Sequence, residues 1–370
     1  MKRTLLLIMA IVLVFAFAAC AKAPTADAPA ADAPAADAPA ADKELEDVEL
    51  SEDFETSNKE DLDAEFTTEG LVFGVAHCVM GEQYWEADVV GMQKAAKELG
   101  IELIVQGAQN DPSKQVEQIE NFIAQEVDAI ICSPVDVNAI LTSVAKCNEA
   151  GIPFIFNSRV TESLEGAVVD SGVGYDAVKM SEAGAEWLVN YATEKGVKLN
   201  LLEVQGAMAD SHTIACMEGL RNVIEGKEDV VEIVATVPTE WDTAVALSGA
   251  LAALKADDTI NAIYYHSDAL YPSIKAALMQ LDMFKTKDEE GHIVLMACGG
   301  TTETLDDIKA GYVDALEVTP IVEVGYESVY QAVRVLSGEI ASGESLLYDA
   351  YVLDSTNYDE KSGSVYGYAA

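Results

Sequence analysis

The chain has 370 residues, 50% of them hydrophobic, and 64 Asp and Glu against 22 Lys and Arg give a formal net charge of −42. So acidic a chain is repelled by nucleic acid, because binding to phosphates requires Lys and Arg that replace counterions. Roughly 300 residues of structured sequence exceed what a single hydrophobic core usually holds, so two domains are expected.

The N-terminus has the pattern of a secretory signal. Lys2 and Arg3 are followed by an uncharged apolar run over residues 5–19, which is short for a membrane span. The run ends in small residues before Cys20, which resembles a bacterial lipobox. This predicts a signal peptide over 1–19 and a lipid-modified Cys20 that anchors the chain to a membrane in the cell envelope, outside the cytoplasm (periplasm or outer face of the cytoplasmic membrane). Ordinary cleavage with an unmodified Cys20 is the alternative.

The remaining cysteines do not form a metal or disulfide pattern. They are odd in number and include no Cys-x-x-Cys pair, so a zinc site or a disulfide framework is not expected. The sequence leaves open whether two of them pair. No metal and no cofactor is predicted. These cysteines are Cys78, Cys132, Cys147, Cys216 and Cys298.

Residues 20–69 have the composition of a stalk. The motif Ala-Asp-Ala-Pro-Ala starts at Ala26, Ala31 and Ala36, and residues 43–69 continue strongly acidic. Alanine, proline and regularly spaced charge favour an extended, self-repelling tether with nothing to bury. We therefore expect a lipidated cysteine and an acidic stalk up to residue 69 with no core of its own.

From Leu71 onward, short apolar runs alternate with longer segments of helical periodicity, which is typical of parallel sheets covered by helices on both faces. Strands are predicted over 71–76, 101–106, 129–132, 153–157, 167–169, 198–204, 230–235, 262–265, 293–297 and 314–318. Helices are predicted over 84–99, 112–125, 137–149, 176–195, 212–225, 241–255, 268–281, 302–310 and 321–337. Asp111 is expected to cap a helix, and Gly100 and Gly151 to end helices. Gly172-Val173-Gly174 lacks the third glycine of a nucleotide-binding loop and is interpreted as a turn.

Ligands of open parallel sheets bind beyond the carboxyl ends of the strands, where this chain places aromatic and hydrogen-bonding side chains in both halves. Such a set predicts a pocket for a small polar ring. An aromatic residue at a helix start can also be core, and Arg159 can also form an interdomain salt bridge. The candidates after the strands include His77, Cys78, Glu82, Tyr84, Trp85, Ser133, Asp136, Ser158, Arg159, Gln205, Trp241, His266, Ser267, Asp268, Gly299, Gly300, Thr301 and Thr319.

Several of these segments resemble a known family, the ribose-binding-protein-like periplasmic binding proteins. The resemblance is carried by Gln83-Tyr84-Trp85 with the following Lys94–Gly100, by Ala108–Gln115, by Val127–Asp136, and by Ala150–Pro153 with Arg159. It extends over about 71–352. It implies two doubly wound α/β lobes with parallel sheets, joined by three hinge crossings, with a ligand in the cleft and an ABC transporter permease as partner.

The resemblance also implies positions for the lobes and for the ligand contacts. The N-terminal lobe would hold 70–172 and 320–350, and the C-terminal lobe and tail 173–319 and 351–370, with crossings near 169–176, 318–320 and 349–352. Thr319 would lie near a hinge. Residues expected to face the ligand are Cys78, Glu82, Tyr84, Trp85, Ser133, Ser158 and Arg159 from the first lobe, and Trp241, Ser267, Asp268 and Gly299 from the second.

This chain departs from the family's sugar-binding pattern at several positions. Glu82-Gln83 stands where Asn-Pro is common, Ser158-Arg159 where Asp-Arg is usual, and Gly299 where an aspartate is expected. An arginine expected near Ile214 is absent. The three aromatic residues and one arginine are retained, so a ring-shaped or polyol ligand is expected, but not ribose in particular.

The sequence favours a monomeric sugar-binding protein for an ABC importer over other functions. The motifs of hydrolases, nucleotide-binding loops and zinc proteases are missing, which argues against an enzyme. A sensory co-receptor, or a binder of a nucleoside, polyol or furanosyl signal molecule, stays open. A transcriptional regulator with this core is excluded by the secretion signal and by the lack of DNA-binding helices.

Overall fold

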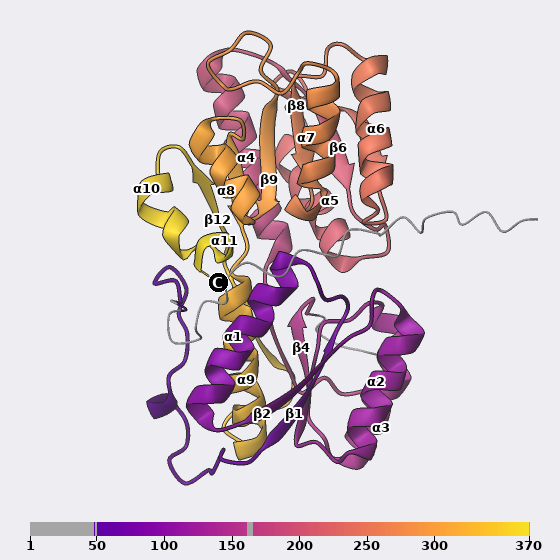
Figure 1. Cartoon of the computed structure of the whole chain (residues 1–370), viewed down its shortest axis with the longest axis vertical. Helices are drawn as coiled ribbons and strands as arrows, with labels where there is room; N and C mark the ends of the chain where they lie inside the picture. Colours follow the sequence, from indigo (N-terminus) through magenta and orange to yellow (C-terminus); the bar gives the residue numbers. More distant parts are fainter. Residues whose placement is uncertain (1–47, 49, 161–165, 370) are drawn as a thin grey trace, which may run out of the picture. The chain divides into compact units, whose positions relative to one another are not determined.

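The computed structural model describes residues 48, 50–160 and 166–369, all within one compact unit that spans Lys43–Ala370. The predicted signal peptide, Cys20 and the first part of the predicted stalk lie outside the described residues. The chain builds two α/β lobes, each around a six-stranded sheet (Figure 1). The predicted fold class is confirmed.

The N-terminal lobe has the strand order β11-β5-β4-β3-β1-β2, and all its paired strands are parallel. Helices α1 and α9 pack together on one face, where Met92 and Val329 are buried, and α2 and α3 cover the other, where Phe122 and Val144 are buried. The elements are β1 (Val72–His77), α1 (Gln83–Leu99), β2 (Glu102–Gly107), α2 (Pro112–Ala124), β3 (Ala129–Cys132), α3 (Val137–Ala150), β4 (Phe154–Ser158), β5 (Ser171–Tyr175), α9 (Ile321–Ser337) and β11 (Glu344–Tyr348).

The C-terminal lobe has the order β12-β10-β9-β8-β6-β7, in which only β12 pairs antiparallel, with β10. The elements are α4 (Ala177–Lys195), β6 (Leu199–Gln205), α5 (Ser211–Ile224), β7 (Val231–Pro238), α6 (Thr243–Ala256), β8 (Ala262–Tyr265), η3 (Asp268–Leu270), α7 (Tyr271–Gln280), β9 (Val294–Gly299), α8 (Thr302–Ala310), β10 (Ala315–Val318) and β12 (Tyr351–Asp354). A tail with α10 (Tyr358–Lys361), η4 (Ser362–Ser364) and α11 (Tyr366–Ala369) follows.

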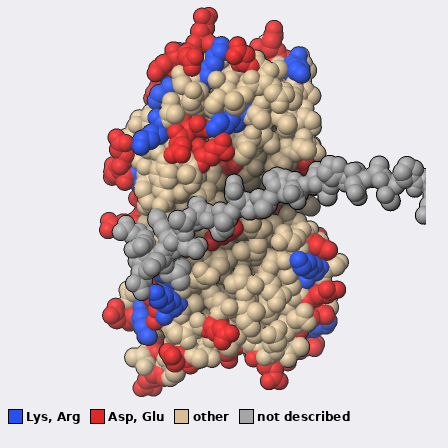
Figure 2. All heavy atoms as spheres, in the orientation of Figure 1, with Lys and Arg blue, Asp and Glu red and all other residues tan. Residues whose placement is uncertain are grey.

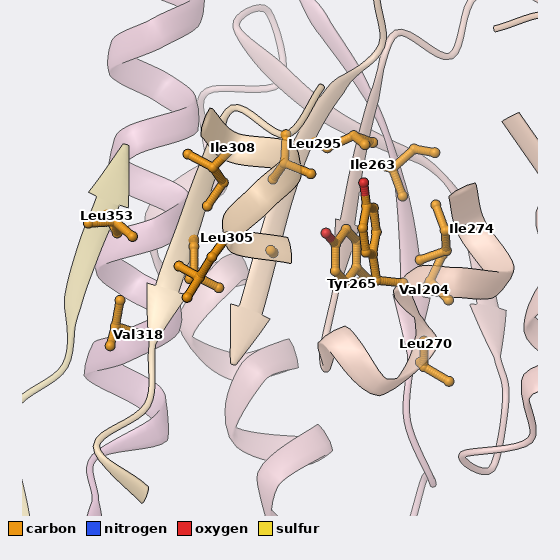
Figure 3. Close-up of a cluster of buried hydrophobic side chains, with 14 of the residues drawn as sticks. Val204, Ile263, Tyr265, Leu270, Ile274, Leu295, Leu305, Ile308, Val318 and Leu353 are labelled. Carbon is orange, nitrogen blue, oxygen red and sulfur yellow. The ribbon is translucent and has the colours of Figure 1, made fainter. Parts of the chain in front are cut away.

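The core of this second lobe lies between its sheet and the helices that cover one face (Figure 3). Ile263, Tyr265 and Leu295 from the strands meet Ile274 of α7 and Leu305 of α8, and all five are at most 1% exposed. Strands buried on both faces need apolar residues at consecutive positions, which is why the sequence shows uniform apolar runs there.

Capping residues mark the helix ends that face the cleft. Asp111, Asp136, Asp176, Asp210 and Asp242 each accept backbone N–H bonds at a helix start, directly after a loop that follows a strand. The predicted cap at Asp111 is confirmed. The glycines predicted to end helices, Gly100 and Gly151, adopt φ values of 73° and 72° and are confirmed as well.

The chain passes from one sheet to the other after Tyr175, after Val318 and after Tyr348, within or next to the predicted crossings. The predicted turn at Gly172-Val173-Gly174 is wrong, because these residues lie inside β5. A Cβ at Gly172 would lie 2.8 Å from Val160, and one at Gly174 would lie 2.8 Å from the Ser158 carbonyl. The glycines therefore serve close packing against the loop after β4, not a turn.

Residues 50–69, which we name the N-terminal strap, differ from the expected stalk because they pack against the lobes. The backbone N–H of Ser51 donates to Glu323 Oε1 at 2.7 Å, and the Ser57 hydroxyl donates to Glu327 Oε1 at 2.7 Å. Phe54 is 7% exposed. The sequence did not predict these contacts because the strap is mostly acidic. Only its few apolar and hydroxyl side chains face α9 and the sheet edges.

The surface agrees with the composition. Figure 2 shows acidic side chains spread over the visible face of both lobes, with fewer basic ones between them. Within the described part of the chain, no helix combines the length and the apolar character that crossing a bilayer would need.

Candidate functional site

A cavity of about 400 Å³ lies where the carboxyl ends of the two sheets meet. Every residue predicted to face the ligand lines it, except Cys78 and Ser133. The lining residues are Val79, Glu82, Gln83, Tyr84, Trp85, Asn110, Ser158, Arg159, Tyr175, His212, Trp241, Thr243, His266, Ser267, Asp268, Ala269, Leu270, Pro272, Cys298, Gly299, Thr301, Glu303 and Thr319. The rule that ligands gather beyond strand ends thus located the cavity from sequence.

The first turn of α1 supplies aromatic walls from the N-terminal lobe. The rings of Tyr84 and Trp85 are perpendicular, with centroids 4.8 Å apart. Glu82 occupies the N-cap position of this helix but its side chain makes no capping hydrogen bond, so its carboxylate remains available to the cavity that it lines. Burial raises the pKa of Glu82, and the charge of Arg159 lowers it.

Arg159 follows β4 and links the two lobes. Its Nη2 lies 2.9 Å from Asp210 Oδ2, its Nη1 donates to the Pro134 carbonyl at 2.9 Å, and its guanidinium lies 5.5 Å from the centre of the Trp85 ring. The interdomain salt bridge that the sequence left as an alternative for Arg159 is present, and Arg159 also lines the cavity. The guanidinium is planar, carries several N–H donors and is fixed in place by these contacts, so it suits hydrogen bonding to ligand oxygens.

Trp241 supplies an aromatic wall from the C-terminal lobe. It lies after β7, its Nε1 donates to Asp210 Oδ2 at 3.0 Å, and its ring covers Gly206, where a Cβ would come within 2.1 Å. The backbone at Glu240 and Trp241 has φ values of 52° and 61°, a left-handed conformation that is costly for non-glycine residues. The surrounding bonds thus hold a strained turn that presents the indole to the cavity.

Hydroxyl groups form a chain across the cavity from one lobe to the other. The Tyr84 hydroxyl lies 2.9 Å from Ser158 Oγ and 3.3 Å from the Tyr175 hydroxyl, which lies 3.4 Å from His212 Nδ1. His212 Nε2 in turn lies 2.9 Å from the carbonyl oxygen of His266. Burial raises the pKa of Tyr84 and of Tyr175, so both phenols stay neutral and are able to donate or accept.

His212, Tyr175 and Cys298 were not among the predicted ligand contacts. His212 is the second residue of α5, the helix that follows β6, and Tyr175 ends β5, part of which the sequence suggested to be a turn. Burial lowers the pKa of His212, but the neighbouring Cys216 and Asp210 outweigh it and raise this pKa to about 9. A histidine at the start of the helix that follows a predicted strand is the sequence signal that could have found it.

Asp268 lines the cavity, but its carboxylate is also used within the protein. Oδ2 accepts the backbone N–H groups of Gly300 and Thr301 at 2.7 and 2.5 Å. Gly299 comes just before these two residues, and a Cβ on Gly299 would lie 2.3 Å from Asp268 Oδ1. The aspartate expected at 299 has no room because the carboxylate of Asp268 occupies that space.

Cys78 and Ser133, two of the residues predicted to face the ligand, are buried and are not among the residues that line the cavity. Ser133 donates to Asn157 Oδ1 at 2.6 Å, and Asn157 donates to Asp88 Oδ1 at 3.1 Å. These residues belong to a polar layer under the site. Burial raises the pKa of the Cys78 thiol to about 11.

The described residues contain no group of three or more His, Cys, Asp or Glu arranged to hold a metal ion. All five cysteines of the described chain are free and buried. What the cavity offers is aromatic surface with hydrogen-bonding groups around it, which is the usual make-up of a site for a small polar molecule.

Comparison with known proteins agrees with this geometry. The family described as periplasmic binding protein domain matches residues 73–340. The ribose import binding protein of Bacillus subtilis is 26% identical over 239 residues, 65% of this chain and 73% of that protein. The xylitol-binding protein of Mycolicibacterium smegmatis is 27% identical, over 60% of each chain.

A solved structure shares the fold. It is an ABC transporter solute-binding protein from Bacillus halodurans with bound myo-inositol, with a TM-score of 0.70 and 23% identity, covering 80% of this chain and 99% of that one. The two lobes, the cleft at the strand ends and the match over 73–340 lead to one conclusion: the chain belongs to the periplasmic binding protein family, as an extracytoplasmic solute-binding protein and not an enzyme.

Proposed function

We propose that this protein captures a sugar or polyol in the cleft and delivers it to an ABC importer. The observation that carries the proposal is the convergence of Tyr84, Trp85 and Trp241 with hydroxyl, imidazole and guanidinium groups around one cavity of about 400 Å³. Flat aromatic surfaces suit the C–H faces of a sugar ring, and the polar groups suit its hydroxyls.

The charge balance of the cavity supports an uncharged ligand. Among the residues that line the cavity, Arg159 is the one Lys or Arg side chain, and Asp210 already pairs with it at 2.9 Å. An anionic ligand would have to compete with that carboxylate and would lie near Glu82. A neutral polyhydroxylated ring can accept hydrogen bonds from Arg159 and donate to the carboxylates without displacing any ion pair.

The relatives support the same ligand class. Those reported above are named for ribose and xylitol, and the solved structure holds myo-inositol. These ligands share several adjacent hydroxyl groups. The departures at Glu82, Ser158 and Gly299 from the common sugar-binding pattern support a ligand other than ribose.

Delivery would occur at a membrane, to which a lipid on Cys20 would anchor the protein as a monomer. The small residues before Cys20 and the apolar run that precedes them support this anchor. A lipid-held binding protein stays near its permease, which raises the local concentration of the loaded form.

A thermal-shift panel of pentoses, hexoses, polyols and nucleosides tests the ligand class, followed by calorimetry on each hit. A ligand that binds only the folded form adds about 2.7 kcal/mol of stability at 100 times its dissociation constant. We expect a sugar or polyol to give the largest shift. A nucleoside as the tightest ligand, with no response to any sugar or polyol, would overturn the proposal.

A further inference from the structure

Residues 299–302, which join the end of β9 to the start of α8 and which we name loop 299–302, form part of the cavity wall and are held on the side away from the cavity. Gly299 and Thr301 line the cavity, and Asp268 binds the backbone N–H groups of Gly300 and Thr301. Two charge-assisted bonds to one carboxylate fix the backbone of this loop. The loop can keep its shape only as long as Asp268 keeps its own position.

Asp268 is in turn held by the C-terminal tail. The Tyr366 hydroxyl donates to Asp268 Oδ1 and Oδ2 at 3.1 and 3.3 Å. Tyr366 is 2% exposed and Asp268 is 3% exposed, so water does not compete for these bonds. Because Oδ2 already serves the loop, the bond to Tyr366 is what orients the second oxygen of the carboxylate.

The tail also contacts the loop directly. The backbone N–H of Gly367 donates to the Gly300 carbonyl at 2.9 Å, and Thr302 Oγ1 donates to the Gly367 carbonyl at 2.7 Å. Gly300 has φ 143°, and a Cβ on it would lie 2.3 Å from Val365 and 3.1 Å from the Tyr366 ring. The loop and the tail therefore fit together without space for a side chain at 300.

The same tail reaches the other lobe. The Tyr366 ring meets the Tyr84 ring edge to face, with the ring centroids 5.8 Å apart. Thr302, which is bonded to the tail, also exchanges hydrogen bonds of 2.9 and 3.1 Å with the Gln83 side chain of the other lobe. Tyr84 lines the cavity from the N-terminal lobe. Tyr366 thus touches a cavity residue of each lobe while lying outside the cavity, and the tail lies beyond the family match, which ends at residue 340.

We propose that the tail segment 362–369 is part of the ligand-binding apparatus, and that Tyr366 is a positioning residue that fixes Asp268 and loop 299–302 in the binding-competent shape. Tyr366 would act through Asp268 and Tyr84 without touching the ligand. The inference rests on the proposed function as far as the ligand is concerned, but the ordering of the loop does not depend on it.

The matched pair of variants is Tyr366→Phe and Tyr358→Phe. Both remove one hydroxyl from a buried tyrosine of the tail, but the Tyr358 hydroxyl bonds the Leu305 carbonyl and the Tyr368 hydroxyl, not Asp268. The probe is the best binder among D-ribose, xylitol and myo-inositol. We expect Tyr366→Phe to weaken its binding by about 3- to 10-fold, as loss of one bond to a buried carboxylate would, and Tyr358→Phe to leave it near wild type.

Two further readouts separate positioning from mere stability. In the double variant with Asp268→Asn, the Tyr366→Phe change should add little, because both act on the same bond. In ligand-free protein, hydrogen exchange of a peptide that covers 299–302 should quicken in Tyr366→Phe and not in Tyr358→Phe.

The exchange experiment keeps this inference distinct from the proposed function. If no sugar or polyol of the thermal-shift panel binds the wild type, the proposed function fails while the exchange result still decides the role of Tyr366. Unchanged loop exchange in Tyr366→Phe, or equal loss of affinity in both single variants, would overturn the inference.

Discussion

Arg159 of the N-terminal lobe and Asp210 of the C-terminal lobe meet across the cleft, with Nη2 and Oδ2 2.9 Å apart. The same Oδ2 accepts the indole N–H of Trp241 at 3.0 Å. One carboxylate therefore joins the arginine of one lobe to the aromatic wall of the other. A ligand that binds between the lobes therefore enters a cavity in which Arg159 and Trp241 are already held by Asp210.

Arg159→Ala should weaken binding of the ligand by roughly 30- to 1000-fold, because it removes both a charge-assisted bond to the ligand and the interlobe bridge. Arg334→Ala is the matched control, since Arg334 pairs with Glu327 at 2.9 Å and neither residue lines the cavity. That control should lower the melting temperature and leave the dissociation constant unchanged. Calorimetry on both variants decides, and equal affinities in wild type and Arg159→Ala would contradict the role of Arg159.

Trp241→Ala should reduce affinity by about 2–4 kcal/mol while changing the stability of the empty protein much less. Trp187 offers a close control, because it is also partly buried in the C-terminal lobe and its Nε1 also donates to an aspartate, Asp354, at 2.7 Å. Trp187 stacks on Tyr191 and does not line the cavity. Its replacement should lower the melting temperature with no effect on binding. The reverse pattern would show that Trp241 only packs the start of a helix.

The sequence predicted most strands and helices of both lobes, because these elements follow from patterns of neighbouring residues. The strands at 129–132 and 262–265 and the helix at 321–337 have the predicted bounds, since uniform apolar runs and helical periodicity leave little choice there. Arg159 and Trp241 followed from their places after strands. Each of these predictions uses only residues that are close together in the sequence.

What the sequence did not predict depends on contacts between distant residues. Nothing near Tyr366 indicates that it reaches Asp268, 98 residues away, and nothing in the acidic strap indicates that Ser51 reaches Glu323. The glycines of β5 looked like a turn because the residues that they pack against, Val160 and Ser158, lie more than ten positions earlier in the chain, outside the local pattern. Such packing becomes visible only when the chain is folded.

Glu323 should make stability fall as pH rises. Burial raises the pKa of this carboxyl from 4.5 to about 7, although the Ser51 N–H bond lowers it. Between these values the folded chain holds a proton that the unfolded chain has lost, so unfolding becomes easier with rising pH, by up to about 3 kcal/mol above pH 7. Glu323→Gln should gain stability at pH 8 and little at pH 4.

Denaturant unfolding from pH 4 to pH 8 measures this difference. The control is Glu232→Gln, at an exposed carboxylate beside Lys198. Its curve should stay parallel to the wild type over the whole range. If the Glu323→Gln curve also runs parallel to the wild type, Glu323 is not the group responsible.

Cys20→Ala should move the protein from the membrane fraction to the periplasm or the medium, because the thioether-linked lipid would be lost. Cys147→Ala, at a cysteine buried in α3, should fractionate as the wild type does. Labelling with a radioactive fatty acid gives a direct second measurement. Unchanged membrane association of the Cys20→Ala protein would rule out the lipid anchor.

Phe54 joins the strap to the third crossing between the lobes. Its ring lies 5.6 Å from the ring of Tyr348, which ends β11, and 5.9 Å from the ring of Tyr351, which begins β12. Phe54→Ala should cost about 3–5 kcal/mol of unfolding free energy, because a buried ring is removed and a cavity is left. It should also loosen the crossing, so amide exchange of residues 348–351 should quicken.

The control for this variant is Phe66→Ala, at a strap residue that packs against the core of the N-terminal lobe. It should lose less stability, because Phe66 is only partly buried, and it should leave exchange at 348–351 unchanged. Equal protection of the crossing in the Phe54 and Phe66 variants would mean that the strap stabilises one lobe and has no part in the hinge.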